Sequence, residues 1–194
     1  SSNFVSKASI DSLICMYEHE KEINVKAIRE ISIDEKKKRK LERYLDVTRS
    51  ELFFAKKILF VEGVAEQLLI KLLAQKIKVD LDKLGITVIN VEGINFDAFL
   101  PLYGENALKI HVAVLTDSDP GAGVYPRKDA KVVPKNISYF KELSNDYVKF
   151  TFSKKTFEYD LALEKENIPV LLAAFQAIHP TLASNFQKDR TEVT

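Results

Sequence analysis

The stretch Lys57–Gln67, KILFVEGVAEQ, is the part of the sequence that decides the fold. Its apolar run Ile58–Val61 is short and stops abruptly at Glu62, and Glu66 follows four residues later, about one helical turn on. The run predicts a short buried strand. The pattern after it predicts a helix over residues 65–77 that faces inward with its leucines, Leu68, Leu69, Leu72 and Leu73. A carboxylate at the end of a buried strand is costly unless a cation lies beside it.

A second apolar run, Val112–Thr116, also stops in carboxylates, at Asp117 and Asp119. In an open parallel α/β sheet, ligands bind outside the carboxyl ends of the strands, so we expect these acids to converge with Glu62 and Glu66. A divalent cation with oxygen ligands, magnesium first, fits such a cluster. With two ions about 4 Å apart, one activates water and the other stabilises the leaving oxygen of a phosphate ester.

Other acids leave alternatives open. Glu158 and Asp160 follow the fourth predicted strand and are further candidates for the same site. Asp117 and Asp119 are also residues that commonly cap loops, so a purely structural role is the competing interpretation. Glu92 follows a second Val-Glu-Gly string, but no acid stands one helical turn later, and we interpret it as a turn residue.

Strands and helices alternate through the rest of the chain, which predicts a mostly parallel four-stranded sheet of the α/β class, flanked by helices. Beyond the two runs above, which predict strands over 58–61 and 110–115, the pattern predicts strands over 86–91 and 147–152, and helices over 96–103, 157–163 and 167–178. Ahead of them, residues 12–17 and 23–28 predict a β-hairpin. A helix is expected over residues 34–54, capped by Ser32 or Asp34.

The composition is ordinary for a globular protein, with 46% hydrophobic and 29% charged residues. The net charge of +1 excludes a global polycation, so any contact with nucleic acid must come from local patches.

Cys15 is the only cysteine, which excludes an internal disulfide and a multi-thiolate zinc site and fits a reducing cytoplasm. No apolar run is long enough to span a bilayer, so no membrane partner is expected. The chain begins with Ser1, which suggests a piece of a longer protein.

Two short motifs carry a family resemblance. The strand ending Val61-Glu62-Gly63 and the later strand ending Asp117-Ser118-Asp119 resemble the Toprim domain of topoisomerases, primases and some nucleases. The longer run Glu42–Ile70 resembles the overcoming-lysogenisation-defect (OLD) nucleases, in which an ABC-type ATPase domain precedes a Toprim domain. Residues 82–99 and 155–163 also resemble that family.

The resemblance implies a domain that cuts or nicks DNA with Mg²⁺ or Mn²⁺, as two ions. It implies Glu62 and Asp117 as catalytic residues and a metal-ligand set comprising Glu62, Glu66, Asp117, Asp119 and Glu158. Arg127 and Lys128, in the loop after these acids, are placed to contact DNA phosphates. The implied domains are the end of the ATPase over residues 1–33, a linker helix over 34–54 and the Toprim nuclease domain over 55–194.

The implied partners are DNA and the protein's own N-terminal ATPase domain, in a full-length homo-oligomer that works in the cytoplasm. OLD-type proteins are often linked to phage defence. The family's nucleases also use a lysine in a later segment that is not found here, so we expect part of the active site to be missing. The rival functions are primase- or topoisomerase-type nucleotidyl transfer and a non-catalytic metal-binding assembly module.

Overall fold

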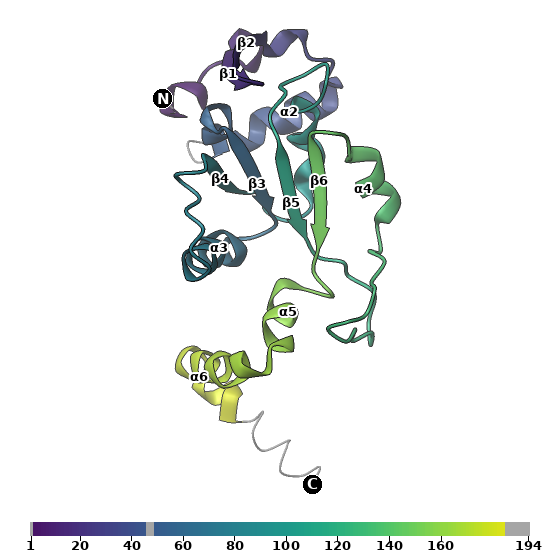
Figure 1. Cartoon of the computed structure of the whole chain (residues 1–194). Coiled ribbons are helices and arrows are strands. Elements are labelled where there is room, and N and C mark those ends of the chain that lie inside the picture. Colours follow the sequence, from purple (N-terminus) through teal and green to yellow (C-terminus); the bar gives the residue numbers. More distant parts are fainter. Residues whose placement is uncertain (1, 46–48, 185–194) are drawn as a thin grey trace.

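The computed structural model describes residues 2–45 and 49–184 (Figure 1). Its centre is a four-stranded sheet in the order β4-β3-β5-β6, in which every neighbouring pair is parallel. The strands are β3 (Lys57–Val61), β4 (Ile86–Asn90), β5 (Val112–Thr116) and β6 (Val148–Phe152). The predicted α/β class with a four-stranded sheet flanked by helices is therefore confirmed.

Helices connect the parallel strands and extend from the last one. The α-helices from β3 onward are α3 (Val64–Lys76), α4 (Ile137–Leu143), α5 (Phe157–Leu163) and α6 (Ile168–Ile178). Short 3₁₀ turns supplement them: η4 (Asn95–Ala98), η5 (Leu100–Leu102) and η6 (Lys165–Asn167). Because all the strands run in one direction, their carboxyl ends meet at a single edge of the sheet (Figure 1).

An antiparallel hairpin, the β1 strand (Ile14–His19) and the β2 strand (Glu22–Ala27), precedes the sheet as predicted. Its two turn residues, Glu20 and Lys21, have φ angles of 50° and 66°, the left-handed values that a two-residue hairpin turn requires. The remaining elements of this part are α1 (Ser2–Val5), η1 (Ile10–Ser12), η2 (Ile28–Glu30), α2 (Glu35–Tyr44) and η3 (Arg49–Phe54).

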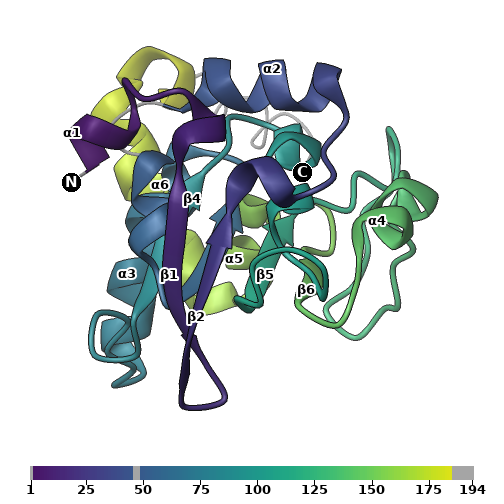
Figure 2. The same ribbon diagram turned by 90° about the horizontal axis from the view of Figure 1, so that it is seen from above.

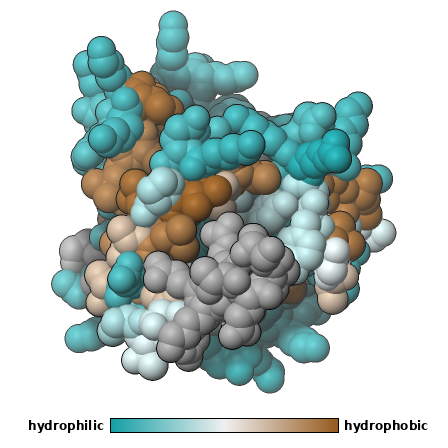
Figure 3. Space-filling model, turned by 90° about the horizontal axis from the view of Figure 1, so that it is seen from below, coloured by the Kyte–Doolittle hydropathy of each residue, from teal (hydrophilic) through white to brown (hydrophobic). Residues whose placement is uncertain are grey.

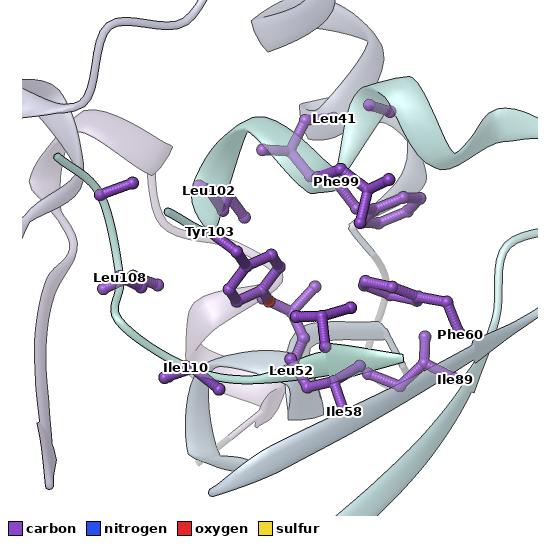
Figure 4. Close-up of a cluster of buried hydrophobic side chains, with 14 of the residues drawn as sticks. Leu41, Leu52, Ile58, Phe60, Ile89, Phe99, Leu102, Tyr103, Leu108 and Ile110 are labelled. Carbon is purple, nitrogen blue, oxygen red and sulfur yellow. The ribbon is translucent and has the colours of Figure 1, made fainter. Parts of the chain in front are cut away.

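One hydrophobic core joins the N-terminal elements to the sheet. Phe60 of β3 is fully buried and packs its ring against Phe99 and Tyr103, with centroids 5.5 and 6.3 Å apart (Figure 4). Leu41 of α2 and Leu52 of η3, both at 0% exposure, belong to the same cluster. The segment before the sheet is therefore packed on the strands and positions them from one side.

The predicted helix over residues 34–54 is shorter than expected. Asp34 caps it as predicted, accepting hydrogen bonds from the amides of Lys36 and Lys37 at 2.9 and 3.3 Å, but the helix ends at Tyr44. Residues 46–48 of that prediction lie outside the described residues. Arg49 Nη1 donates to the carbonyl of Tyr44 and Nε to that of Asn90, so contacts with β4 replace a continued helix.

Two further predictions about helices are wrong in detail. Residues 96–103 do not form one helix: η4 ends at Ala98 and η5 contains Pro101, which has no amide proton to donate to a longer helix. On α3, Leu68 and Leu72 were expected to face inward, yet they are 64% and 57% exposed.

The last helix lies away from the sheet (Figure 1). No residue of α6 is buried, and its apolar side chains contribute to the brown surface that Figure 3 shows from below. Among the described residues, no helix combines the length and the apolar character needed to cross a membrane.

Candidate carboxylate site

Glu62 lies at the carboxyl edge of the sheet, directly after β3, and Asp117 directly after the neighbouring strand β5. The parallel register, with Phe60 opposite Val114, brings the ends of the two strands together. Glu62 Oε1 accepts hydrogen bonds from the Asp117 amide at 2.8 Å and from the Thr116 hydroxyl. The end of β5 therefore fixes the orientation of the Glu62 carboxylate.

Asp117 experiences the charge of three other acids. Its pKa is raised from 3.8 to about 6, chiefly by burial. Repulsion from Glu62, Glu66 and Asp119 contributes to this rise, and a hydrogen bond from Ser153 opposes it. The Ser153 hydroxyl donates to Asp117 Oδ1 at 2.9 Å from the end of β6. Four of the five acids named from the sequence are thus close enough to interact electrostatically.

Glu66 is only 8% exposed, although it lies on a helix with a largely exposed apolar surface. Among the described residues, no hydrogen bond or ion pair holds its carboxylate. A Cβ atom added to Gly63 would lie 2.9 Å from Glu66 Oε2, so the glycine makes room for this oxygen. The Glu66 oxygens are not among the fully buried, unpaired side-chain atoms of the described residues, so this carboxylate remains accessible to a small cation.

Asp119 and Glu158 are less tightly held. Asp119 is exposed and has a left-handed backbone with a φ of 43°. Glu158 accepts a hydrogen bond from the Thr156 hydroxyl at 3.0 Å and is not among the charges that act on Asp117. Asp160 accepts the amide of Lys154 at 2.8 Å and so stabilises the segment after β6.

The loop that follows Asp119 makes side-chain contacts with the start of α5. Lys155 Nζ lies 3.8 Å from the centre of the Tyr125 ring, and the Tyr159 hydroxyl donates to the carbonyl of Pro126 at 2.9 Å. Lys128 forms an ion pair with Glu164 at 2.5 Å, and Arg127 is exposed.

Some features of the site were predicted and others were missed. Glu92 has a left-handed φ of 56°, which agrees with its prediction as a turn residue, and it forms an ion pair with Arg49 at 2.7 Å. Thr116 and Ser153, which hold the two central carboxylates, were not singled out. Their position at the ends of strands next to acids was the available signal.

The carboxylate oxygens of these acids are the type of ligand that a divalent cation needs, because Mg²⁺ and Mn²⁺ prefer oxygen ligands. Within residues 2–45 and 49–184, however, no three acids, histidines or cysteines stand together as a ready metal site. Oε2 of Glu62 and Oδ2 of Asp117 are the oxygens that the hydrogen bonds from Thr116, the Asp117 amide and Ser153 leave available.

A parallel four-stranded sheet with acids after two adjacent strands defines a domain of the Toprim type, a class that typically binds divalent metals. Residues 53–119 match the family described as "overcoming lysogenization defect protein-like, TOPRIM domain". This match over residues 53–119 confirms the resemblance predicted from the sequence, and the family matched is one of nucleases.

A comparison with solved structures found C-terminal regions of OLD proteins. The C-terminal region of the Xanthomonas campestris pv. campestris OLD protein is 26% identical, with a TM-score of 0.50 over 68% of this chain and 65% of that one. The C-terminal region of the Burkholderia pseudomallei OLD protein is 31% identical, with a TM-score of 0.44 over 56% of this chain and 58% of that one. The chain thus spans less than two thirds of either region. A comparison with curated proteins found no match.

Proposed function

We propose that this chain is the Toprim part of a metal-dependent DNA endonuclease or nickase that hydrolyses phosphodiester bonds. The observation that carries the proposal is geometric: Glu62 and Asp117 follow the paired parallel strands β3 and β5, and the Asp117 amide donates to Glu62 Oε1 at 2.8 Å. Burial, with repulsion from Glu62, Glu66 and Asp119, raises the pKa of Asp117, which agrees with this clustering. Carboxylates gathered at the carboxyl edge of a parallel sheet repel one another, and a bound cation would offset that repulsion.

Each central residue has a role that follows from its contacts. Glu62, anchored through Oε1, presents Oε2 as a metal ligand and as a general base for the attacking water. Asp117, anchored by Ser153 through Oδ1, presents Oδ2 as the second catalytic carboxylate. Glu66 supplies a buried oxygen beside Gly63. Asp119 completes the cluster, and Glu158 supports it from α5.

These five carboxylates would hold Mg²⁺ or Mn²⁺, as two ions. When bound, such ions supply positive charge to phosphodiester oxygens and make water more acidic. The chain's own contribution is to hold two carboxylates rigidly at the ends of paired strands, so that ligand oxygens need little reorganisation.

DNA would reach the site along the loop that follows Asp119. Arg127 is exposed there, and Lys128 would exchange its ion pair with Glu164 for a phosphate. The partners proposed are DNA and a preceding ATPase domain in a homo-oligomeric protein, with residues 1–33 as the end of the ATPase and 34–54 as the linker. An outward apolar face on the hairpin supports a preceding domain: Ile14, Met16, Ile23 and Val25 are 60–71% exposed.

Supercoiled-plasmid cleavage in Mg²⁺ or Mn²⁺ tests the proposal, with the isosteric variants Glu62→Gln and Asp117→Asn. Each is expected to lose about a hundredfold or more of the metal-dependent rate, because each removes a charged ligand but keeps the side-chain shape. Glu142→Ala, an exposed acid on α4, is the matched control. Equal cutting by all variants would refute the site, and no cutting by the full-length protein would favour the assembly-module alternative.

A further inference from the structure

A groove lies at the opposite end of the sheet from the carboxylates, between the β1–β2 hairpin and the beginnings of the parallel strands. Residues 16–21 of the hairpin form one wall, and the segments before β3, β4 and β5 form the other, around a volume of about 760 Å³. Figure 2 shows the hairpin lying over this end of the sheet.

The groove concentrates positive charge on a chain whose net charge is only +1. Five lysines line it against two glutamates: Lys21, Lys56, Lys57, Lys83 and Lys109, facing Glu18 and Glu20. Lys109 pairs with Glu105, and the ion pair of Lys56 with Glu18 is long, at 3.7 Å, and exposed. Within the described part of the chain, Lys21, Lys57 and Lys83 make no ion pair. Three exposed ammonium groups are therefore available to an anionic ligand.

Aromatic side chains accompany the lysines. Phe54 lines the groove and is 60% exposed, whereas the neighbouring Phe53 packs against the hydrophobic core. His111 stacks on Tyr147 with centroids 5.4 Å apart, and His19 of the hairpin contacts the same tyrosine at 5.8 Å. These ring contacts link the hairpin wall to the segments that precede β5 and β6.

We propose that this groove binds a single strand of DNA, with phosphates on Lys21, Lys57 and Lys83 and a base stacked on Phe54. Grooves that combine cationic side chains with exposed aromatic rings suit single strands, because every base has a stacking face. The groove volume of about 760 Å³ falls within the roughly 300–1,000 Å³ of pockets that hold small molecules, which is room for a few nucleotides of one strand. The inference deepens the proposed function, since it takes DNA as the substrate.

The test is binding of a fluorescein-labelled oligothymidylate of about 15 nucleotides to the 194-residue chain, followed by anisotropy in EDTA. The triple variant Lys21→Gln, Lys57→Gln, Lys83→Gln is expected to bind about tenfold more weakly at low salt, and its slope of log affinity against log salt should be shallower by about 2. Phe54→Ala should weaken binding by about five- to 150-fold without changing that slope.

Matched controls separate the groove from general charge and exposed apolar surface. The triple variant Lys76→Gln, Lys141→Gln, Lys149→Gln removes three exposed lysines elsewhere, and Phe4→Ala removes a phenylalanine that is 74% exposed. Controls that bind like the wild type support the groove. Equal losses in controls and groove variants, unchanged binding by the groove variants, or tighter binding of a duplex of the same length would overturn it.

Binding in EDTA is independent of cleavage, so the two proposals fail separately. If the chain binds through the groove but never cuts plasmid, the groove proposal is supported and the nuclease proposal is refuted. The opposite result is metal-dependent cutting that needs Glu62 and Asp117, with groove variants that bind like the wild type. It would refute the groove proposal and support the nuclease proposal.

Discussion

Replacement of Asp117 by asparagine is expected to stabilise the folded protein at neutral pH, while it removes a carboxylate from the proposed site. Burial, with repulsion from Glu62 and its neighbours, raises the pKa of Asp117 from 3.8 to about 6 in the folded state. Asparagine keeps the shape and the acceptor that the Ser153 hydroxyl uses, at 2.9 Å, and carries no charge. The variant therefore isolates the cost of the ionised carboxylate.

The magnitude follows from linkage between protonation and folding. The difference between 3.8 and about 6 corresponds to at most about 3 kcal/mol, at about 1.4 kcal/mol for each pH unit. Asp117 is half-buried, and solvent screening reduces the expected effect to about 1–1.5 kcal/mol. Below pH 3.8 both states bind the proton and the difference is absent. It grows as pH rises through this window and is complete above about pH 6.

Urea unfolding of the wild type and Asp117→Asn, in EDTA from pH 4 to pH 8, measures this difference. The variant should gain stability relative to the wild type across the window and keep a constant advantage above about pH 6. Added Mn²⁺ should stabilise the wild type more than the variant, because only the wild type offers the full carboxylate set. A variant that is less stable than the wild type at pH 7.5, or a difference that is the same at every pH, would refute the reasoning.

Four further predictions concern single positions. Gly63→Ala should leave stability within about 1 kcal/mol but weaken Mn²⁺ binding, measured by calorimetry, because the new Cβ displaces the Glu66 carboxylate, 2.9 Å away. Native Cys15 should react with iodoacetamide at pH 8 far more slowly than in urea, since burial raises its pKa to about 11; equal rates would contradict this. Phe60→Ala should cost about 3–5 kcal/mol in urea unfolding, because the ring is fully buried between two others; a cost below about 1 kcal/mol would argue against this packing. Asp34→Ala should cost about 1 kcal/mol, seen as an earlier urea midpoint, through loss of the cap on α2, and Asp34→Asn should restore most of it.

Several features could be predicted from local sequence. Short apolar runs such as Ile58–Val61 are bounded by polar residues, and this pattern depends on neighbours in the chain, so the four strands were predicted to within two residues at each end. The acids at the ends of two of these strands then followed from the rule that parallel strands finish at one edge. Asp34 as a helix cap is another local signal.

Other features depended on packing between distant segments. Leucines on α3 were expected inside, but the helix buries Glu66 and Ala74 and exposes Leu68 and Leu72. A helical periodicity identifies an apolar stripe but does not say which neighbouring element covers it. The helix after Asp34 likewise ends at Tyr44, and Arg49 donates to the carbonyls of Tyr44 and Asn90, contacts that helix propensity does not reveal.

The sequence by itself determined the α/β class, the resemblance to the OLD-like Toprim family and the acids at the strand ends, because strand periodicity and short motifs are properties of contiguous residues. Only the tertiary structure decided how those acids are held. Thr116 orients Glu62, and Ser153 orients Asp117 from strand β6, 36 residues away in the chain. Burial of Glu66 and the groove at the opposite end of the sheet also arise only on folding, because they depend on which distant segments exclude water from a side chain.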